Sequence, residues 1–374
     1  MMRRQLIAIC GGIFGCLLSL SHGVAFQSGL PKNNPMSERK IALGRALFFD
    51  KQLSIDGTVS CATCHDPASA FASGDAVAIG VREQKGTRNA PTLLNSVFSQ
   101  SYFWDGRTAT LEEQAKQPLL NPSEMGMKNE AALVERISAI DEYRKSFQRV
   151  FPREGVTLDT IANAIAAFER TLVSDNSPFD RFISGDQQAI SAAQKRGWKL
   201  FKGKAKCIEC HSFTGASPFF TDFQSYNTGI AANEMTLTKS LPTGRQGQDS
   251  ASLFAHTRGF AELGRYLVTN ELKDIGAFKT PTLRDIELTG PYMHNGSIKT
   301  LLDVVRFYNQ GGEKNSNLDE KLRPLNLTDE EMSDLVEFMR ALTSDAVLRQ
   351  VQSSKPQNRN PVLLSPVKVV RKVM

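Results

Sequence analysis

The chain is 374 residues long, with 45 Lys and Arg, 39 Asp and Glu and a formal net charge of +6. Much of this charge is terminal: Arg3 and Arg4 open the chain, and residues 346–374 carry six basic and no acidic side chains. Without these eight residues, 37 basic side chains face 39 acidic ones. The nearly neutral body argues against nucleic acid as a partner, because nucleic-acid binding needs concentrated basic charge.

The N-terminus has the pattern of a secretory signal peptide over residues 1–25. A charged start, Met1–Arg4, precedes the apolar stretch Leu6–Leu20, and small residues suited to cleavage end at Ala25. An uncleaved membrane anchor is the alternative, but the apolar stretch is short and interrupted by three glycines. A lipidated Cys16 is a further alternative. We expect a periplasmic protein with no membrane span after cleavage.

The rest of the chain predicts a mainly α fold. A helix start is expected at Ser37, and apolar residues recur at spacings of three and four over residues 158–172. The polar segment Ser174–Pro178 interrupts this pattern. Further helices are expected over residues 300–310 and after Thr328, which begins a capping box. Roughly 350 residues after the signal suggest two domains.

Two C-x-x-C-H sequences, Cys61–His65 and Cys207–His211, are the signature of covalent c-type haem attachment. The six cysteines include two in the signal segment, so no thiol remains for a disulfide. In each sequence both thiols would bind the porphyrin covalently, and the histidine would bind the iron. The expected haem-binding residues are therefore Cys61, Cys64, His65, Cys207, Cys210 and His211. A zinc site with four thiolate ligands is the alternative, but it does not explain the histidine after each pair.

A weak internal repeat supports two haem-binding units. The pattern G-x-x-L-F occurs at Gly44–Phe48 before the first motif and at Gly197–Phe201 before the second. We therefore expect two cytochrome c-like domains in tandem, over residues 26–185 and 186–345. Residues 346–374 are expected to be a basic, poorly ordered tail.

Histidine is scarce, and this limits how the irons can be ligated. After the signal only four remain, and His65 and His211 belong to the motifs, which leaves His256 and His294. Met and Tyr are the other plausible axial ligands. A two-haem protein short of distal ligands suggests one iron open to peroxide or dioxygen and one that relays electrons.

Several further motifs occur in a characteristic order: Leu43–Asp50 with Ser60–His65, Arg88–Thr92, Phe103–Arg107, Asn121–Met125, Phe278–Arg284 and Pro291–Gly296. Through them the chain resembles the bacterial di-haem cytochrome c peroxidase family, including its MauG branch, along most of residues 38–345. The resemblance implies that the first haem reacts with peroxide and the second relays electrons. It places Trp104 between the haems, although a Trp can equally be core packing.

The resemblance also implies the surroundings of the reactive haem. Gln114 and Glu124 match its distal polar residues, and Pro118 would shape the same pocket. A carboxyl there can move a proton between the two peroxide oxygens. Glu124 can alternatively be a helix-start carboxylate. Asn89, Thr289 and Pro291 match an interdomain calcium site; an ordinary Asn and a turn are the alternative.

Two departures from the peroxidase pattern favour the MauG branch. Residues 66–102 contain no histidine, and Val81 stands roughly where many peroxidases have a removable distal ligand. Fourteen residues after His294, where peroxidases have Met, this chain has Tyr308, as MauG proteins do. A phenolate ligand would lower the potential of the relay haem. Alternatively, Tyr308 is only an inward-facing aromatic of a helix.

Three functions follow from the pattern. The first is a MauG-like oxidoreductase, which uses hydrogen peroxide and a high-valent di-haem state to oxidise a protein or another donor. The second is a cytochrome c peroxidase that takes electrons from a small c-type cytochrome. The third is a di-haem electron carrier without catalysis. Tyr308 and the missing distal His favour the first, whereas Gln114 and Glu124 argue against the third. The cofactors expected are two covalent haem c groups and one calcium ion.

Overall fold

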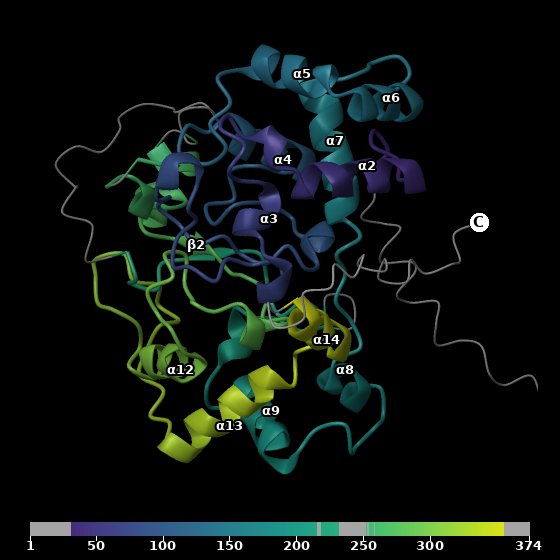
Figure 1. Cartoon of the computed structure of the whole chain (residues 1–374). Helices are drawn as coiled ribbons and strands as arrows, with labels where there is room; N and C mark the ends of the chain where they lie inside the picture. The colour runs from purple at the N-terminus through teal and green to yellow at the C-terminus, as the bar shows by residue number, and fades with distance from the viewer. Residues whose placement is uncertain (1–30, 215–217, 232–251, 253, 258, 355–374) are drawn as a thin grey trace, which may run out of the picture. The chain divides into compact units, whose positions relative to one another are not determined.

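A computed structural model describes residues 31–214, 218–231, 252, 254–257 and 259–354 (Figure 1). The contacts divide the chain into Met1–Pro35 and Met36–Met374, and the elements described here belong to the second unit. The helices and strands are α2 (Glu38–Phe49), α3 (Cys61–Cys64), α4 (Leu111–Leu120), α5 (Glu130–Ala139), α6 (Asp141–Val150), α7 (Leu158–Glu169), α8 (Pro178–Ile183), α9 (Ala192–Lys202), β1 (Ser225–Tyr226), α11 (Tyr266–Thr269), β2 (Phe278–Lys279), α12 (Leu301–Asn309), α13 (Asp329–Arg340) and α14 (Asp345–Ser354). The predicted mainly α fold is confirmed.

The first hydrophobic core forms where α2 packs against α7, and α4 also packs against α7 (Figure 1). Ser37 caps α2, as expected from the sequence, by accepting a hydrogen bond from the Lys40 N–H. At the helix crossing, a methyl group placed on Gly44 would lie 1.8 Å from the carbonyl oxygen of Ala164. Only glycine therefore lets the two backbones approach this closely.

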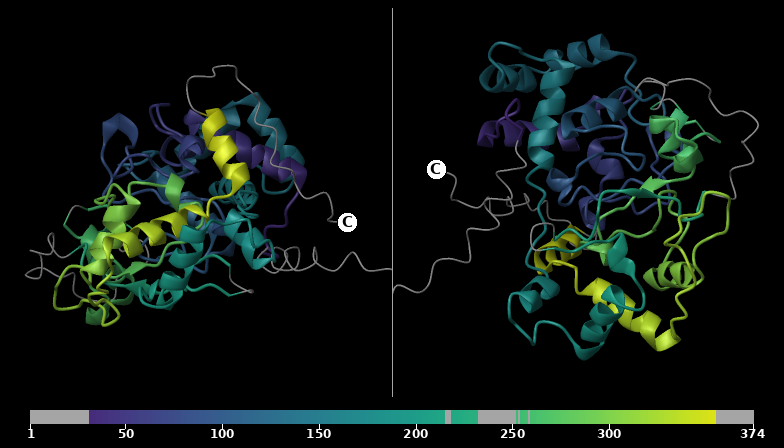
Figure 2. Two further views of the ribbon diagram at one scale, coloured as in Figure 1. Left: turned by 90° about the horizontal axis from the view of Figure 1, so that it is seen from below. Right: turned by 180° about the vertical axis from the view of Figure 1, so that it is seen from behind.

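The second core repeats this arrangement with α9 and α13, which lie side by side in Figures 1 and 2. A methyl group on Gly197 would lie 2.0 Å from the carbonyl oxygen of Asp334 in α13. Thr328 and Glu331 form the predicted capping box of α13. The weak G-x-x-L-F repeat thus marks the same backbone contact in two helix pairs. In each core the G-x-x-L-F helix precedes a haem motif along the chain.

The strands are few in the described part of the chain. β1 and β2 form a two-stranded antiparallel sheet with Ser225 opposite Lys279 and Tyr226 opposite Phe278. The Lys279 N–H also donates to the carbonyl oxygen of Trp104, at 2.7 Å. This short sheet therefore connects the segment after the second haem motif to the Trp104 loop.

Residues 170–177 connect α7 to α8. Ser177 caps α8 and shares the carboxylate of Asp180 with Arg284, which binds that carboxylate through two nitrogens at 2.5 and 2.7 Å. Arg284 is buried. The predicted break in the helical pattern is present, and a buried ion pair fixes the chain after it.

The C-terminal segment differs from expectation. Within residues 346–374, expected to be a poorly ordered tail, α14 extends to Ser354, because Val347 and Val351 bury their side chains in the first hydrophobic core. For residues 346–354 that expectation is wrong; residues 355–374 lie outside the described part. So does the proposed signal peptide, residues 1–25.

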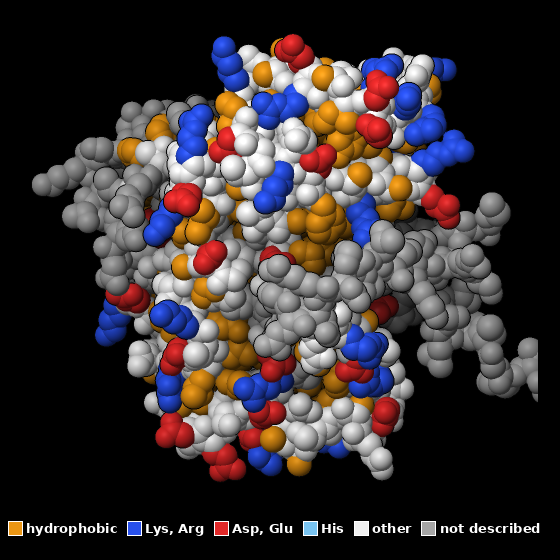
Figure 3. Space-filling model, in the orientation of Figure 1, with side chains coloured by type: hydrophobic (Ala, Val, Ile, Leu, Met, Phe, Trp, Pro, Cys, Tyr) orange, Lys and Arg blue, Asp and Glu red, His pale blue; other side chains and the backbone are white. Residues whose placement is uncertain are grey.

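The surface agrees with the nearly neutral charge of the body. On the face drawn in Figure 3, basic and acidic side chains are interspersed, and neither sign gathers into one patch. Among the described helices, none combines the length and the apolar character that crossing a membrane requires.

Candidate haem sites and active site

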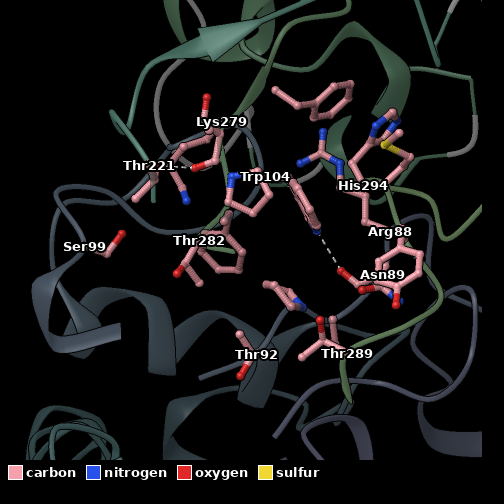
Figure 4. A pocket seen from close by; sticks show the side chains of 18 of the residues that line it. Arg88, Asn89, Thr92, Ser99, Trp104, Thr221, Lys279, Thr282, Thr289 and His294 are labelled. Carbon is pink, nitrogen blue, oxygen red and sulfur yellow. Dashed lines mark hydrogen bonds between the residues drawn. The ribbon is translucent and has the colours of Figure 1, made fainter. Parts of the chain in front are cut away.

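One continuous cavity of about 440 Å³ contains the candidate site (Figure 4). Its volume lies in the range of roughly 300–1,000 Å³ that is usual for cofactor and ligand sites. The structure brings together all the residues that the sequence singled out, since its lining includes Cys61, Cys64, His65, Asn89, Trp104, Gln114, Pro118, Glu124, Cys207, Cys210, His211, Thr289, Pro291 and Tyr308.

The first C-x-x-C-H motif forms the short helix α3. Ser60 and Thr63 cap it reciprocally, and the His65 ring follows at its C-terminal end. His65 Nδ1 lies 3.2 Å from the Phe71 carbonyl oxygen and 3.0 Å from that of Pro91. Because a carbonyl only accepts, Nδ1 carries the ring proton and Nε2 is the unprotonated nitrogen. Burial lowers the pKa of His65, which keeps the ring neutral.

The second motif has the same arrangement. His211 Nδ1 lies 3.0 Å from the carbonyl oxygen of Phe220, which again leaves Nε2 as the free ligand atom. Phe220 is fully buried in an aromatic cluster with Phe179, Trp198 and Phe338. The rigid cluster fixes the carbonyl that orients His211.

The thiols suit covalent attachment rather than metal binding. Burial raises the pKa of Cys64 and Cys210 to about 11 and that of Cys207 to about 12. The pKa of Cys61 is raised by burial as well. Within the described residues, which include these four cysteines, no three Cys, His, Asp or Glu gather around one possible ion. The four-thiolate zinc alternative is therefore excluded, and the residues fit two haem groups.

Gln114 and Pro118 project from α4, and Glu124 follows in the next loop. The Glu124 backbone is held on both sides: its N–H donates to Asn121, and its carbonyl accepts from Val81, at 3.1 and 2.8 Å. Burial raises the pKa of the Glu124 carboxyl to about 7, although Arg107 partly opposes this. A carboxyl with this pKa can both accept and donate a proton near neutral pH.

Val81, which stands where a distal His was considered, is buried in the first hydrophobic core. Gly80 beside it contacts the Glu124 backbone so closely that a methyl group there would lie 2.1 Å from the Ser123 carbonyl oxygen. The Val81 side chain does not belong to the cavity lining.

His256 is a site residue that the sequence suggested only as a possible iron ligand. Its Nδ1 lies 3.4 Å from Glu124 Oε1, and its Nε2 lies 3.3 Å from Arg107 Nη2. Burial, with Arg107 and Arg88 nearby, lowers the His256 pKa to about 3, so the ring is neutral. No local motif marks His256; only the scarcity of histidine in the chain pointed to it.

Trp104 lines the same cavity as the two motifs. Its indole N–H donates to the carbonyl oxygen of Asn89, at 2.8 Å (Figure 4). The His294 ring lies edge-on to Trp104 and stacks on Phe278 at 3.6 Å. His294 Nε2 is engaged with Glu262 at 2.7 Å. His294 Nε2 is therefore already engaged, which argues against an iron bound through that nitrogen.

Tyr308 projects from α12 toward the second motif. Burial raises its pKa, and Cys210 and Cys207 raise it further, which places the phenol close to both thiols. Within the described part of the chain its hydroxyl has no hydrogen-bond partner. Without iron the phenol is therefore protonated, and as an axial ligand it would have to lose this proton and bind as the phenolate.

The three residues considered for calcium also line the cavity, and Asn89 and Thr289 lie near each other in Figure 4. The side-chain amide nitrogen of Asn89 donates to the backbone carbonyl oxygen of Asp75. The backbone N–H of Asn89 donates to the backbone carbonyl oxygen of His294. The side-chain oxygen of Asn89 is left as an acceptor. With no acidic cluster in the described residues, a cation here would be held by neutral oxygens.

Comparison with known proteins identifies the class. The profile of the di-haem cytochrome c peroxidase family, which includes MauG, matches residues 38–188. The cytochrome-c peroxidase IdrP1 of Denitromonas iodatirespirans is 38% identical over 340 residues, which cover 89% of each chain. The methylamine utilization protein MauG of Methylorubrum extorquens is 38% identical over 316 residues, covering 84% of this chain and 81% of its own.

Among solved structures, a MauG-like protein associated with microbial copper homeostasis is 33% identical with a TM-score of 0.70. The match covers 85% of this chain and 93% of that one. The chain belongs to the di-haem cytochrome c peroxidase and MauG family. It is a peroxide-dependent di-haem oxidoreductase with tandem cytochrome c domains.

Proposed function

We propose that this protein is a MauG-like enzyme of the periplasm, which uses hydrogen peroxide to oxidise a protein or another donor. The observation that carries the proposal is Tyr308. It lies beside Cys207 and Cys210, and among the described residues its hydroxyl has no hydrogen-bond partner. Since a Tyr ligand favours ferric iron over ferrous iron, a haem bound here would be a poor acceptor of electrons from a small cytochrome.

When bound, the haem at Cys61, Cys64 and His65 supplies an iron that binds and reduces peroxide, and the second haem supplies electrons to it. The protein contributes the proton transfer. Glu124 would accept a proton from the peroxide oxygen nearer the iron and return it to the far oxygen, which then leaves as water. Its pKa of about 7 suits both steps.

The other side chains of this pocket would restrict what enters it. Gln114 and Pro118 lie on the same helix as each other, four residues apart, and both line the cavity. The Gln114 amide can donate a hydrogen bond to a bound oxygen species. A di-haem electron carrier without catalysis needs neither this amide nor a carboxyl of raised pKa. Gln114 and Glu124 therefore argue against the carrier function.

The alternative is a cytochrome c peroxidase that reduces peroxide to water with electrons from a small c-type cytochrome. Relatives with that name are as similar to this chain as those named MauG. The alternative would not require Tyr308 as a ligand.

Two accompanying proposals complete this function. One calcium ion would bind between the two domains through Asn89, Thr289 and Pro291, where neutral oxygens suit a hard cation. Export by the N-terminal signal would place the enzyme in the periplasm, where c-type haem is attached.

The deciding experiment adds one equivalent of peroxide to the purified ferric enzyme and follows its absorption spectrum. The same sample is then tested for turnover with reduced small cytochrome c. A long-lived oxidised spectrum with slow cytochrome oxidation is expected. Rapid cytochrome oxidation would instead support the peroxidase, and an unchanged spectrum would contradict both.

A further inference from the structure

Lys279 is a cationic residue of the cavity that has no anionic partner. Its side chain lines the cavity beside Trp104 (Figure 4). Within the described part of the chain its ammonium makes no ion pair or hydrogen bond, and no carboxylate influences its pKa, which burial alone lowers to about 8. Lys279 as a whole is half-buried, and an ammonium shielded from solvent is normally paired, because removing an unpaired charge from water is costly.

The other basic side chains lining the cavity are either already partnered or exposed. Arg88 and Arg107 bind Asp105. Lys321 donates to the Tyr226 hydroxyl at 2.8 Å, and the exposed Lys206 lies near Glu209. The remaining one, Arg323, is exposed. Among the described residues, Lys279 is therefore the basic side chain of the cavity lining that can pair with an anion bound inside the cavity.

The backbone places Lys279 on the side of the second haem motif. Its strand pairs with β1, which follows that motif, and Lys279 lies opposite Ser225. Lys321 influences the pKa of the Cys210 thiol, whereas Lys279 influences neither Cys207 nor Cys210. Of these two lysines, Lys321 is the one close to the Cys210 thiol, and Lys279 is attached to the Trp104 loop through its backbone N–H. The thioether bonds hold one edge of a c-type haem, and its two propionate carboxylates extend from another.

We propose that Lys279 binds a propionate carboxylate of the haem attached at Cys207 and Cys210, and so raises the midpoint potential of that haem. The proposal rests on haem binding at the second motif, but not on the reaction with peroxide. A positive charge beside the propionate disfavours ferric iron relative to ferrous iron, because the ferric haem carries one more positive charge. Salt screens such an effect less where the two charges are partly shielded from solvent than where they are exposed.

Lys279 would thereby counteract Tyr308. The phenol lowers the potential of this haem, whereas the ammonium raises it, next to the Trp104 loop to which the Lys279 backbone is bonded. The two residues together would set how readily the second haem gives up electrons.

The test uses the holoenzyme and compares Lys279→Met, Lys279→Gln and Lys279→Arg with the exposed control Lys299→Met. Haem content is measured first, and spectroelectrochemical titration then gives both midpoint potentials. We expect Lys279→Met and Lys279→Gln to shift the second haem to a more negative potential and Lys279→Arg to stay near wild type. Lys299→Met should change nothing.

Resonance Raman spectra of the same samples report the propionate bending modes directly. We expect these modes to shift in Lys279→Met and not in Lys299→Met. An unchanged potential, or a potential shift without a change in the propionate modes, would overturn the proposal. These readouts need no peroxide, so their failure differs from a failure of the proposed enzymatic function. If Lys279→Met loses haem, the midpoint potentials and propionate modes of Lys279→Gln and Lys279→Arg test the proposal instead.

Discussion

The Nδ1 atom of His256 lies 3.4 Å from the Oε1 atom of Glu124, although 131 residues separate them in the chain. The guanidinium of Arg107 faces the other ring nitrogen and can only donate a hydrogen bond. The neutral ring must therefore accept at Nε2 and carry its proton on Nδ1, toward the carboxyl. Arg107 itself is fixed by Asp105, at 3.0 Å. Asp105, Arg107 and His256 thus form a row of neighbouring side chains that ends at the Glu124 carboxyl.

The pH dependence of the peroxide reaction should follow Glu124. Burial raises its pKa to about 7, so the carboxyl is mostly neutral below pH 7 and mostly ionised above it. Only the ionised form accepts a proton, so the rate should rise as the pH increases through 7. Stopped-flow absorbance after mixing with peroxide measures this. A rate that falls over the same range would contradict the role of Glu124 as a base.

Replacing the carboxyl should remove this dependence. Glu124→Gln keeps the size of the side chain but cannot accept the proton, and we expect the peroxide rate to fall about 10²–10⁴-fold. Glu113→Gln is the matched control, because Glu113 lies on the exposed face of α4. A variant Glu124→Gln that reacts at the wild-type rate would show that another group moves the proton.

Removing His256 should shift the pH profile without abolishing the reaction. His256→Phe deletes the N–H that faces Glu124, so the carboxylate loses a stabilising donor and the midpoint should move up by about one pH unit. His256→Gln supplies an amide donor and should restore part of the shift. If both variants keep the wild-type midpoint, His256 does not influence the carboxyl.

The sequence predicted this site unevenly. Glu124 could be named because it lies in the Asn121–Met125 motif, and Gln114 because it matches a polar residue of the family at that position. His256 could not, because no sequence spacing encodes a contact between segments so far apart. Lys279 stands inside a recognised motif, yet only the fold shows that it lacks a partner. The end of the chain was mispredicted for a similar reason: its basic composition suggested a tail, whereas Val347 and Val351 fill the first core.

Exchanging the proposed axial tyrosine should change the potential of the second haem. Tyr308→Met replaces an anionic ligand with a neutral thioether, which favours ferrous iron, so we expect a more positive midpoint potential. Phe307→Met, on the same helix, is the control and should leave the potential unchanged. Spectroelectrochemical titration measures both. If Tyr308→Met has the wild-type spectrum and potential, Tyr308 is an inward aromatic and no ligand.

The repeated glycines offer a test of the fold that is independent of haem chemistry. The sequence showed that Gly44 and Gly197 are equivalent, but not why. In the structure each lies where two helix backbones cross, and a methyl group would overlap a carbonyl oxygen of the facing helix. A backbone cannot rotate away as a side chain can, so the helices would have to separate.

We therefore expect Gly44→Ala and Gly197→Ala each to lower the free energy of unfolding by about 3 kcal/mol, despite the higher helix propensity of alanine. Gly74→Ala is the control, because its nearest neighbour would lie at an ordinary 3.4 Å. Guanidinium unfolding followed by circular dichroism measures the three variants. Since alanine alone would stabilise a helix, unchanged or increased stability in either variant would mean that the helices do not cross in backbone contact there.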